Sequence, residues 1–346
     1  MGVFSGGGIG LDLGSTNITV YLENEGVVLR EPSFVLTLRE DVDEILAFGR
    51  DARQMLGRTP KDVSLLSPIV GGAVGNIDLT IALIRNLTEK ALGKRRAIER
   101  SPLVVSLSQG ATRVEQEALE TAVRSAGAKS AFLLRTPIAA ALGAGVTIDD
   151  ARGCMIVVLG GMTTEIGVLS LNGIAAARVT RRGSNAIDES IVRYIRRENG
   201  LIIGQRTAED LKIDLGSASN TAYLYSEEAS LRGRDARSGR PATVTIHASD
   251  VHRAIVSTLD ELLENIREAF ENTPAEMAED IMTRGIYLSG GGAQLDGLRD
   301  RLSDMLNLPV RVMENPQDHV SRGCCMVASD NRLAQKLLQT GCLIEL

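Results

Sequence analysis

Three glycine-containing turns, each directly after a run of β-forming residues, are the segments of this sequence best suited to phosphate chemistry. They lie at residues 12–17 (Asp-Leu-Gly-Ser-Thr-Asn), 160–163 (Gly-Gly-Met-Thr) and 290–293 (Gly-Gly-Gly-Ala). Glycine allows backbone N–H groups to approach an anion closely, and the neighbouring hydroxyl groups add further donors. A single such turn is weak evidence, because tight turns require glycine for conformational reasons alone. Three in one chain favour a site that grips a nucleotide.

The first two turns lie in matching patterns. In each, a β-forming run (9–13 and 156–159) precedes the turn and a second run (18–22 and 166–169) follows it, which is typical of a β-hairpin. Gly14 and Gly161 are roughly 147 positions apart, about the length of one domain. We therefore predict that the same unit opens each of two α/β lobes, with a cleft between the lobes.

Apolar periodicity predicts helices over residues 78–92, 114–126, 138–144, 187–198, 251–270 and 295–306. The helix at 138–144 follows Pro137 and consists mainly of small residues, so we expect it to approach a neighbouring element closely. The charged stretch 226–241 is predicted to be a loop. The final stretch, 332–346, is expected to be a packed terminal helix, with a partner-binding tail as the alternative.

The composition fits a globular protein with two lobes. A chain of 346 residues with 44% apolar residues exceeds one typical core. The net charge of −6 and the absence of tryptophan argue against nucleic acid as a partner, because nucleic-acid sites need basic surfaces and stacking aromatics.

The cysteines and the N-terminal residues indicate a reducing, cytoplasmic location. Cys154, Cys324, Cys325 and Cys342 lack the spacing of metal ligands, and the three histidines are scattered. Residues 1–5 lack the features of a signal peptide, and no stretch approaches the ~20 apolar residues of a spanning helix.

The segment Gly10–Asn17 resembles the first phosphate loop of the superfamily that contains actin, sugar kinases and heat-shock chaperones. Further segments resemble the bacterial MreB family in particular, at residues 31–33, 55–60, 139–145, 206–212, 216–218 and 288–293. The resemblance covers residues 10 to about 329. It implies an actin-like α/β fold, with two lobes of duplicated, ribonuclease H-like domains around a nucleotide cleft. We assign residues 1–145 and 315–346 to lobe I, with a small subdomain at about 31–74, and residues 146–314 to lobe II, with a small subdomain at about 185–250.

The same resemblance implies binding of ATP or ADP with Mg²⁺ and gives roles to individual residues. Asp12 should organise Mg²⁺ through water, since Mg²⁺ prefers carboxylate and water oxygens. Glu209 and Lys212 should bracket the ribose and the adenine. The residues expected at the phosphates are Gly14, Ser15, Thr16, Asn17, Gly160, Gly161, Met162 and Thr163, and those expected near the adenosine and the α-phosphate are Gly290, Gly291, Gly292 and Ala293.

Several positions depart from the family pattern where hydrolysis would take place. Val158 replaces the aspartate that opens the family's second phosphate loop, and Met162 replaces its third glycine. Arg135 and Thr136 replace an acidic pair that the family uses to polarise the attacking water, and neither is a good general base near neutral pH. The later turn at residues 183–185, Gly-Ser-Asn, lacks another carboxylate of the family. We therefore expect weak or absent ATP hydrolysis.

Partner expectations also follow from the resemblance. The chain should form homopolymeric filaments involved in cell shape, alone or with a paralogous MreB, and should contact the inner face of the cytoplasmic membrane. Basic residues Lys94, Arg95 and Arg96 with Ile98, and the N-terminal Val3 and Phe4, are the candidate membrane contacts. The alternatives are an active filament-forming ATPase with compensating residues and a non-polymerising actin-fold scaffold. A small-molecule kinase is a remote fourth possibility.

Overall fold

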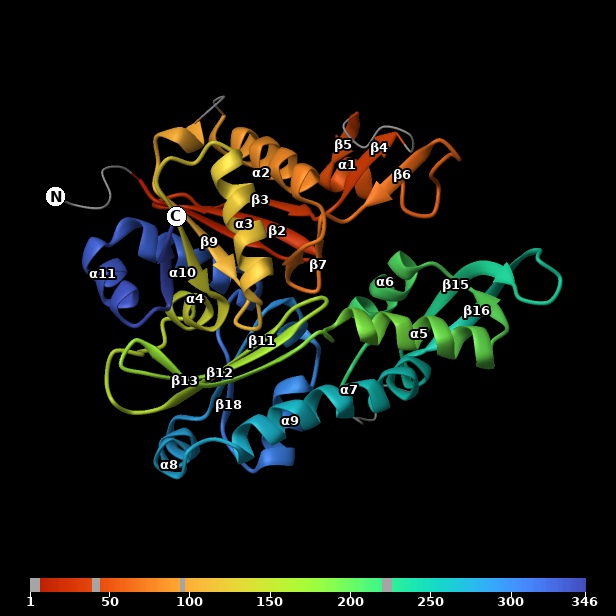
Figure 1. Cartoon of the computed structure of the whole chain (residues 1–346). Helices are drawn as coiled ribbons and strands as arrows, with labels where there is room; N and C mark the ends of the chain where they lie inside the picture. The colour runs from red at the N-terminus through yellow and green to blue at the C-terminus, as the bar shows by residue number, and fades with distance from the viewer. Residues whose placement is uncertain (1–6, 39–43, 94–96, 220–225) are drawn as a thin grey trace.

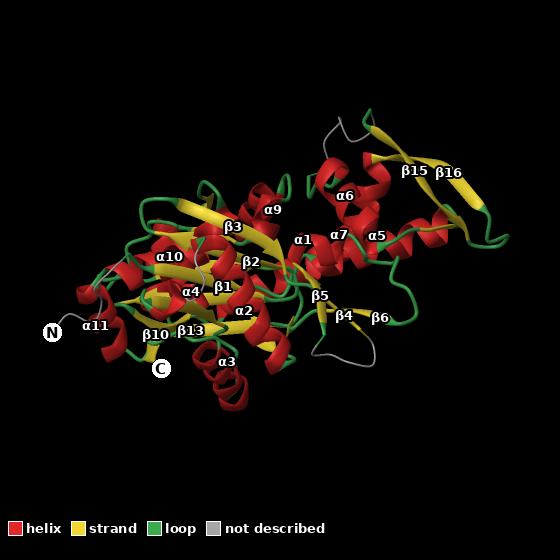
Figure 2. Ribbon diagram, turned by 90° about the horizontal axis from the view of Figure 1, so that it is seen from above, coloured by secondary structure: helices red, strands yellow, loops and turns green. Residues whose placement is uncertain are grey.

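The structure is a computed structural model that describes residues 7–38, 44–93, 97–219 and 226–346. Two main sheets with helices packed against them form the body of the molecule, and two smaller three-stranded sheets project from it on the same side (Figures 1 and 2). Among the described residues, no helix is both long enough and apolar enough to cross a bilayer.

The first main sheet has the strand order β19-β10-β9-β1-β2-β3. β1, β2 and β3 form an antiparallel meander, while β9 and β10 run parallel to β1. β9 is completely buried, as expected for a strand covered on both faces. The strands are β1 (Ile9–Leu13), β2 (Asn17–Leu22), β3 (Gly26–Pro32), β9 (Leu103–Leu107), β10 (Ala131–Arg135) and β19 (Leu343–Glu345).

The second main sheet, β13-β12-β11-β17-β18, repeats the order β3-β2-β1-β9-β10 of the first. Again a three-stranded antiparallel meander continues into two parallel strands. This repeat confirms the predicted duplicated α/β architecture, whereas the lobe boundaries that we assigned remain a prediction. The strands are β11 (Cys154–Leu159), β12 (Thr164–Ser170), β13 (Gly173–Thr180), β17 (Ile286–Ser289) and β18 (Val310–Val312).

Two helices rich in small residues, α4 (Thr136–Gly143) and α10 (His319–Ser329), pack closely and share one apolar core with both main sheets. A Cβ atom at Gly323 would lie 1.9 Å from the backbone oxygen of Ala139, and one at Gly143 would lie 1.8 Å from that of His319. The close approach predicted for residues 138–144 is therefore confirmed, and it requires glycine at both contact points.

Other helices complete the cores of the two sheets. α2 (Ile77–Leu92) and α3 (Arg113–Ser125) pack on the first sheet, and the hydrogen bond from Leu79 N–H to the Asn76 side chain caps α2. The second sheet is covered by α5 (Asn185–Glu198), α7 (Ala248–Glu271), α8 (Ala275–Arg284) and α9 (Leu298–Leu306). The remaining short elements are β7 (Ile69–Val70), β8 (Ala73–Val74), η1 (Ala97–Glu99), η3 (Gly291–Gln294), η4 (Pro316–Asp318) and α11 (Asn331–Gln339).

The two smaller sheets project beyond the main sheets on the same side of the molecule (Figure 1). One contains β4 (Val35–Leu38), β5 (Ile45–Phe48) and β6 (Val63–Leu66), next to α1 (Gly49–Arg53). The other contains β14 (Leu201–Ile202), β15 (Glu228–Asp235) and β16 (Pro241–His247), next to α6 (Gln205–Leu215).

Two predictions of local structure were wrong. Residues 226–241 were expected to be a loop, but half of them form β15, which pairs with β16. β15 alternates between inward and outward positions, but its inward positions carry only Ala229, Leu231 and Gly233 between mostly charged residues, so the segment has the composition of a loop. The helix expected over residues 332–346 ends at Gln339. Gly341 then takes a positive φ of 70°, which reverses the chain, and β19 pairs with β10.

Of the candidate membrane contacts, the structure describes only Ile98. Ile98 is only 3% exposed and belongs to the core of the first sheet, so the expectation that it contacts lipid was wrong. Its apolar side chain packs inward because η1 turns it onto α2 and the strands beneath. Val3, Phe4, Lys94, Arg95 and Arg96 lie outside the described residues.

Candidate functional site

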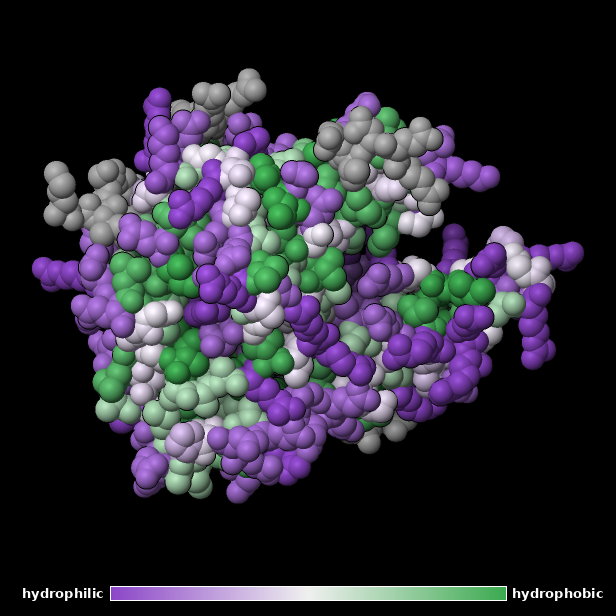
Figure 3. Space-filling model, viewed as in Figure 1, coloured by the Kyte–Doolittle hydropathy of each residue, from purple (hydrophilic) through white to green (hydrophobic). Residues whose placement is uncertain are grey.

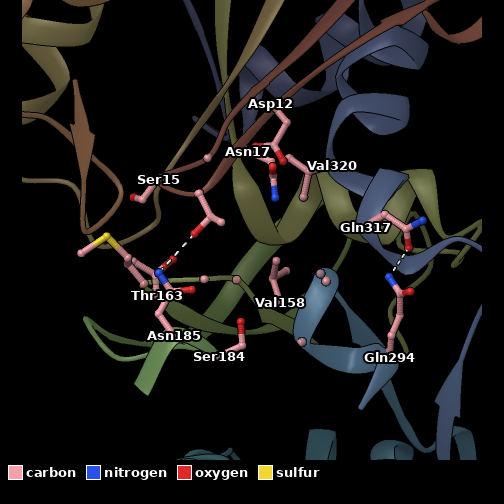
Figure 4. Close-up of a pocket in the computed structure, with 18 of the residues that line it drawn as sticks. Asp12, Ser15, Asn17, Val158, Thr163, Ser184, Asn185, Gln294, Gln317 and Val320 are labelled. Carbon is pink, nitrogen blue, oxygen red and sulfur yellow. Dashed lines mark hydrogen bonds between the residues drawn. The ribbon is translucent and has the colours of Figure 1, made fainter. Parts of the chain in front are cut away.

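A cavity of about 470 Å³ is lined by both main sheets and by α6 (Figure 4). All but one of the residues predicted to bind nucleotide or metal line it; the exception is Ala293, which is buried in the adjoining core. The lining residues among those predictions are Asp12, Gly14, Ser15, Thr16, Asn17, Gly160, Gly161, Met162, Thr163, Glu209, Lys212, Gly290, Gly291 and Gly292.

The β1–β2 turn and the β11–β12 turn approach each other so closely that only glycine fits at the contact. A Cβ atom at Gly161 would lie 1.9 Å from Oγ1 of Thr16. Asn185, at the start of α5, donates from Nδ2 to the same oxygen at 3.4 Å (Figure 4). On the first turn, Ser15 Oγ accepts a hydrogen bond of 2.9 Å from Gly72 N–H. The two turns therefore form a narrow cradle with unobstructed backbone, which fits a phosphate chain.

Asp12, at the end of β1, presents its carboxylate to this cradle (Figure 4). Its Oδ1 accepts a hydrogen bond of 2.8 Å from Ser106 Oγ. Burial raises the pKa of Asp12 to about 6, and the Ser106 hydrogen bond counteracts part of that rise. A nearby Mg²⁺ would favour the ionised form, so a hydrated Mg²⁺ between Asp12 and a nucleotide phosphate fits the residues present.

The positions that depart from the family pattern supply no carboxylate. Val158 lines the cavity, and only 7% of it is exposed. Thr136 is buried and donates its hydroxyl hydrogen to the backbone oxygen of Leu107 at 3.1 Å. Arg135 donates to the backbone oxygen of Ser108 at 3.2 Å and is absent from the cavity lining.

One carboxylate in the cavity, Glu165, escaped the sequence analysis. It is 4% exposed, and its Oε2 accepts a hydrogen bond of 2.8 Å from the backbone N–H of Gln109. Burial raises the pKa of Glu165 to about 7, and the hydrogen bonds from Gln109 and Ser108 offset part of that rise. An isolated carboxylate in the otherwise apolar run of β12 was the available signal.

The two residues expected near the ribose and adenine are both held by charged partners. Glu209 of α6 forms an ion pair with Arg53 of α1. This pair links the two helices that lie next to the small sheets. Lys212 Nζ lies 2.8 Å from Oδ1 of the buried Asp188. Burial raises the pKa of Asp188 to about 6, and the Lys212 ammonium opposes that rise.

A pair of glutamines at another part of the lining was also missed. Gln294 Nε2 donates to Gln317 Oε1 at 2.5 Å, and both side chains line the cavity (Figure 4). They come from η3 and η4, which are 23 positions apart along the chain. No sequence pattern around either glutamine predicts that the two side chains pair.

Comparisons with known proteins agree with this arrangement. A family model described as MreB/Mbl protein matches residues 6–336. The chain is 36% identical over 315 residues to the cell shape-determining protein Mbl of Bacillus subtilis (strain 168), covering 91% of this chain and 93% of that protein. It is 37% identical over 329 residues to the cell shape-determining protein MreB of Escherichia coli (strain K12), covering 93% of each.

Solved structures show the same fold. The crystal structure of MreB 5 of Spiroplasma citri bound to AMPPNP matches with a TM-score of 0.88 at 28% identity, covering 97% of this chain and 98% of that one. The structure of the same protein bound to ADP matches with the same TM-score and covers 99% of that chain. The fold is therefore actin-like, and the chain belongs to the MreB/Mbl family.

Proposed function

We propose that this protein is a filament-forming cytoskeletal subunit that binds ATP or ADP with Mg²⁺ in the cavity and hydrolyses ATP slowly or not at all. The observation that carries the proposal is the convergence of three glycine turns and Asp12 on one cavity. The nucleotides bound to MreB 5 of Spiroplasma citri support it, and the names of the curated relatives support a role in cell shape.

The two hairpin turns would hold the phosphates from opposite sides. The hydroxyls of Ser15 and Thr16 and the backbone of Asn17 serve one side, and Gly160, Gly161 and Thr163 serve the other. Asp12 orients the hydrated Mg²⁺, which neutralises phosphate charge. Because contacts to one ligand come from both main sheets, the bound nucleotide fixes their relative angle and so the surfaces presented to a second copy.

Slow hydrolysis follows from the groups that surround the expected γ-phosphate position. Val158 cannot orient water, and the hydroxyl hydrogen of Thr136 is already donated to Leu107. Arg135 does not line the cavity, and its guanidinium could not accept a proton. A filament subunit of this kind would keep its nucleotide for long periods, and its filaments would be long-lived, alone or with a paralogous partner.

A second candidate function, active ATP hydrolysis, is favoured by Glu165. Its pKa of about 7 suits a group that accepts a proton near neutral pH, and it lines the same cavity. Its hydrogen bond from the backbone N–H of Gln109 holds it in place as a buried structural carboxyl group, which favours the first candidate. The rate of ATP turnover by the Glu165→Gln variant distinguishes a catalytic role of Glu165 from a structural one.

Peripheral contact with the cytoplasmic membrane is part of the proposal. After the correction for Ile98, it rests on Val3 and Phe4 and on the basic residues Lys94, Arg95 and Arg96. A cluster of cations favours an anionic leaflet by roughly 1 kcal/mol each. Flotation with liposomes of anionic lipid tests it: a variant with Val3 and Phe4 deleted and Lys94–Arg96 neutralised should stay unbound, and undiminished binding would refute it.

The central experiment measures phosphate release and sedimentation on the same sample, with Mg·ATP, with Mg·ADP and without nucleotide. We expect nucleotide-dependent pelleting with little phosphate released. Phosphate release at the rate of ordinary family members would refute slow hydrolysis. Nucleotide binding without any polymer would refute the filament role and favour the scaffold alternative.

A further inference from the structure

Two carboxylates face the cavity from the strands of opposite main sheets. Among the residues that the structure describes, Asp12 on β1 and Glu165 on β12 are the only carboxylates that these strands contribute to the cavity wall. Glu165 is the cross-strand neighbour of Val158, which Figure 4 shows at the cavity. Asp12 faces the proposed metal, whereas the buried Glu165 is bonded to the protein itself.

Glu165 holds a loop of the first main sheet, the segment 108–112 between β9 and α3. Its Oε2 accepts a hydrogen bond of 2.8 Å from Gln109 N–H, and the Ser108 hydroxyl donates a second hydrogen bond to it. The pairing of β9 with β10 ends at Leu107, so side-chain contacts hold the loop beyond that residue. A carboxylate of the second sheet therefore fixes backbone of the first.

Further contacts seat the same loop on the second sheet. A Cβ atom at Gly110 would lie 3.0 Å from the side chain of Val179, so the loop packs tightly on β13. Arg181, just beyond β13, forms an ion pair with Glu115 in the first turn of α3. The loop and the start of α3 thus lie against the second sheet in one defined place.

The end of β9 that leads into this loop also orients Asp12. The pairing of β1 with β9 stops before Asp12, and the Ser106 side chain takes over from it. Ser106 Oγ accepts a hydrogen bond of 3.1 Å from Leu13 N–H and donates one of 2.8 Å to Asp12 Oδ1. Ser106 precedes Ser108 by two positions, so a displaced loop would also displace the hydroxyl that orients the Asp12 carboxylate.

We propose that Glu165 is a positioning residue for the metal end of the site. As a hydrogen-bond acceptor it holds the segment 108–112, and thereby keeps Ser106 and the Asp12 carboxylate where a hydrated Mg²⁺ binds. Removing a group that supports a metal-orienting carboxylate typically lowers metal affinity by roughly 10–100-fold. Because the support comes from the opposite sheet, Mg²⁺ is bound firmly only when the second sheet is closed on the first. The inference rests on the proposed nucleotide site and adds a residue that supports its metal.

The test is a calorimetric comparison of ADP binding with Mg²⁺ and with EDTA. The ratio of the two affinities is the metal gain, and a diphosphate avoids any turnover. Glu165→Leu removes the acceptor, whereas Glu165→Gln keeps a carbonyl oxygen that can accept from Gln109 N–H.

Glu31→Leu is the matched control. Glu31 is 5% exposed, and its Oε2 also accepts a hydrogen bond of 2.8 Å from a backbone N–H, that of Arg50, but Glu31 does not line the cavity. Circular dichroism melts verify that each variant is folded. If a leucine variant does not fold, Glu165→Ala and Glu31→Ala replace the two leucine variants.

We expect the metal gain to fall by about tenfold in Glu165→Leu, because Asp12 loses its support. In Glu165→Gln the gain should stay within about twofold of the wild type, because the acceptor is retained. Glu31→Leu should lose folding stability but keep the metal gain.

Three results would overturn the inference: an unchanged metal gain in Glu165→Leu, no effect of Mg²⁺ on the wild type, or an equal loss in Glu165→Gln. The last would mean that the charge of Glu165, rather than its acceptor, acts on the metal. If the wild type binds ADP under neither condition, the proposed nucleotide site fails instead, so the two failures are distinguishable.

Discussion

Arg53 of α1 and Glu209 of α6 form an ion pair although they are 156 positions apart in the chain. Each lies next to one of the small sheets, and Glu209 also lines the cavity. The pair therefore connects the two projecting parts of the molecule at the wall of the proposed nucleotide site.

Breaking this connection should accelerate nucleotide exchange. We expect Arg53→Ala to release a fluorescent ADP analogue about five to ten times faster in stopped-flow experiments, because the opening loses its link. The side chains are a quarter exposed, so the loss of folding stability should stay below about 1 kcal/mol. Arg113→Ala, which removes an exposed pair with Glu117, is the control and should leave the rate unchanged. Unchanged release in Arg53→Ala would show that the pair does not restrain the opening.

Glu165 should make the protein less stable as the pH rises. Its pKa is raised from 4.5 to about 7, so the folded state binds its proton more tightly than the unfolded state. The resulting stability is complete below about pH 4.5 and is lost as the pH rises through about 7, with an upper limit of about 3 kcal/mol. Urea unfolding at pH 5 and pH 8 should show a smaller difference for Glu165→Gln than for the wild type.

Two further points affect the comparison of Glu165→Gln with the wild type. Asp12 and Asp188 also have raised pKa values of about 6, so part of the decline will persist in the variant. Glu117→Gln, on the exposed face of α3, should follow the wild type. The same pH dependence in Glu165→Gln and in the wild type would contradict the assignment of the decline to Glu165.

Restoring the family's carboxylate at position 158 should raise ATP turnover. Val158→Asp places an oxygen acceptor in the cavity, and we expect at least about tenfold faster phosphate release if a missing carboxylate limits the rate. Burial of a polar group here should cost at least about 1–3 kcal/mol of folding stability, and more for a carboxylate than for an amide. Val158→Asn has a similar shape without a basic carboxylate and should remain slow. Equal turnover of Val158→Asp and the wild type would locate the defect elsewhere.

A side chain at position 161 should abolish nucleotide binding. In Gly161→Ala the new Cβ would lie 1.9 Å from Thr16 Oγ1, so the two turns must separate. We expect affinity for Mg·ADP to fall more than about a hundredfold in calorimetric titrations, because both halves of the phosphate cradle shift. Gly204→Ala, where a Cβ meets nothing within 4 Å, should bind like the wild type. Normal binding by Gly161→Ala would mean that the cradle does not hold the phosphates.

Alanine at position 323 should destabilise the fold without touching the cavity. Its Cβ would lie 1.9 Å from the backbone oxygen of Ala139, and α4 and α10 share the core between the main sheets. The steric cost of about 1–3 kcal/mol or more should exceed the gain of up to about 1 kcal/mol from replacing glycine within a helix. Thermal unfolding measures the difference, with Gly204→Ala again as the control. A rise in melting temperature would show that the helices can separate at no cost.

Much of the architecture could be predicted because its signals are local. The two hairpins around Gly14 and Gly161 repeat one pattern, and the helices at 78–92, 114–126 and 251–270 have strong periodicity; all are present. The surface of the molecule in Figure 3 mixes polar and apolar residues, as the balanced composition suggests. β15 was missed, because the small residues of its inward face lie between mostly charged residues, which is the composition expected of a loop.

The positions of the predicted site residues on the cavity wall also follow from that repeat, because related hairpins place their turns at related places in the two lobes. Their neighbours could not be predicted in the same way. Glu165 meets the backbone of Gln109 from 56 positions away, and Lys212 is held by Asp188 beneath it.

The sequence by itself determined the family, the duplicated actin-like fold and the glycine turns, since each depends on residue types at fixed short spacings. Only the tertiary structure decided which side chains share the cavity: Glu165 in it, Arg135 outside it, Gln294 beside Gln317, and Glu209 paired with Arg53. The physical reason is that these relationships join distant segments, and their energies depend on burial and distance, which no local pattern of residues encodes.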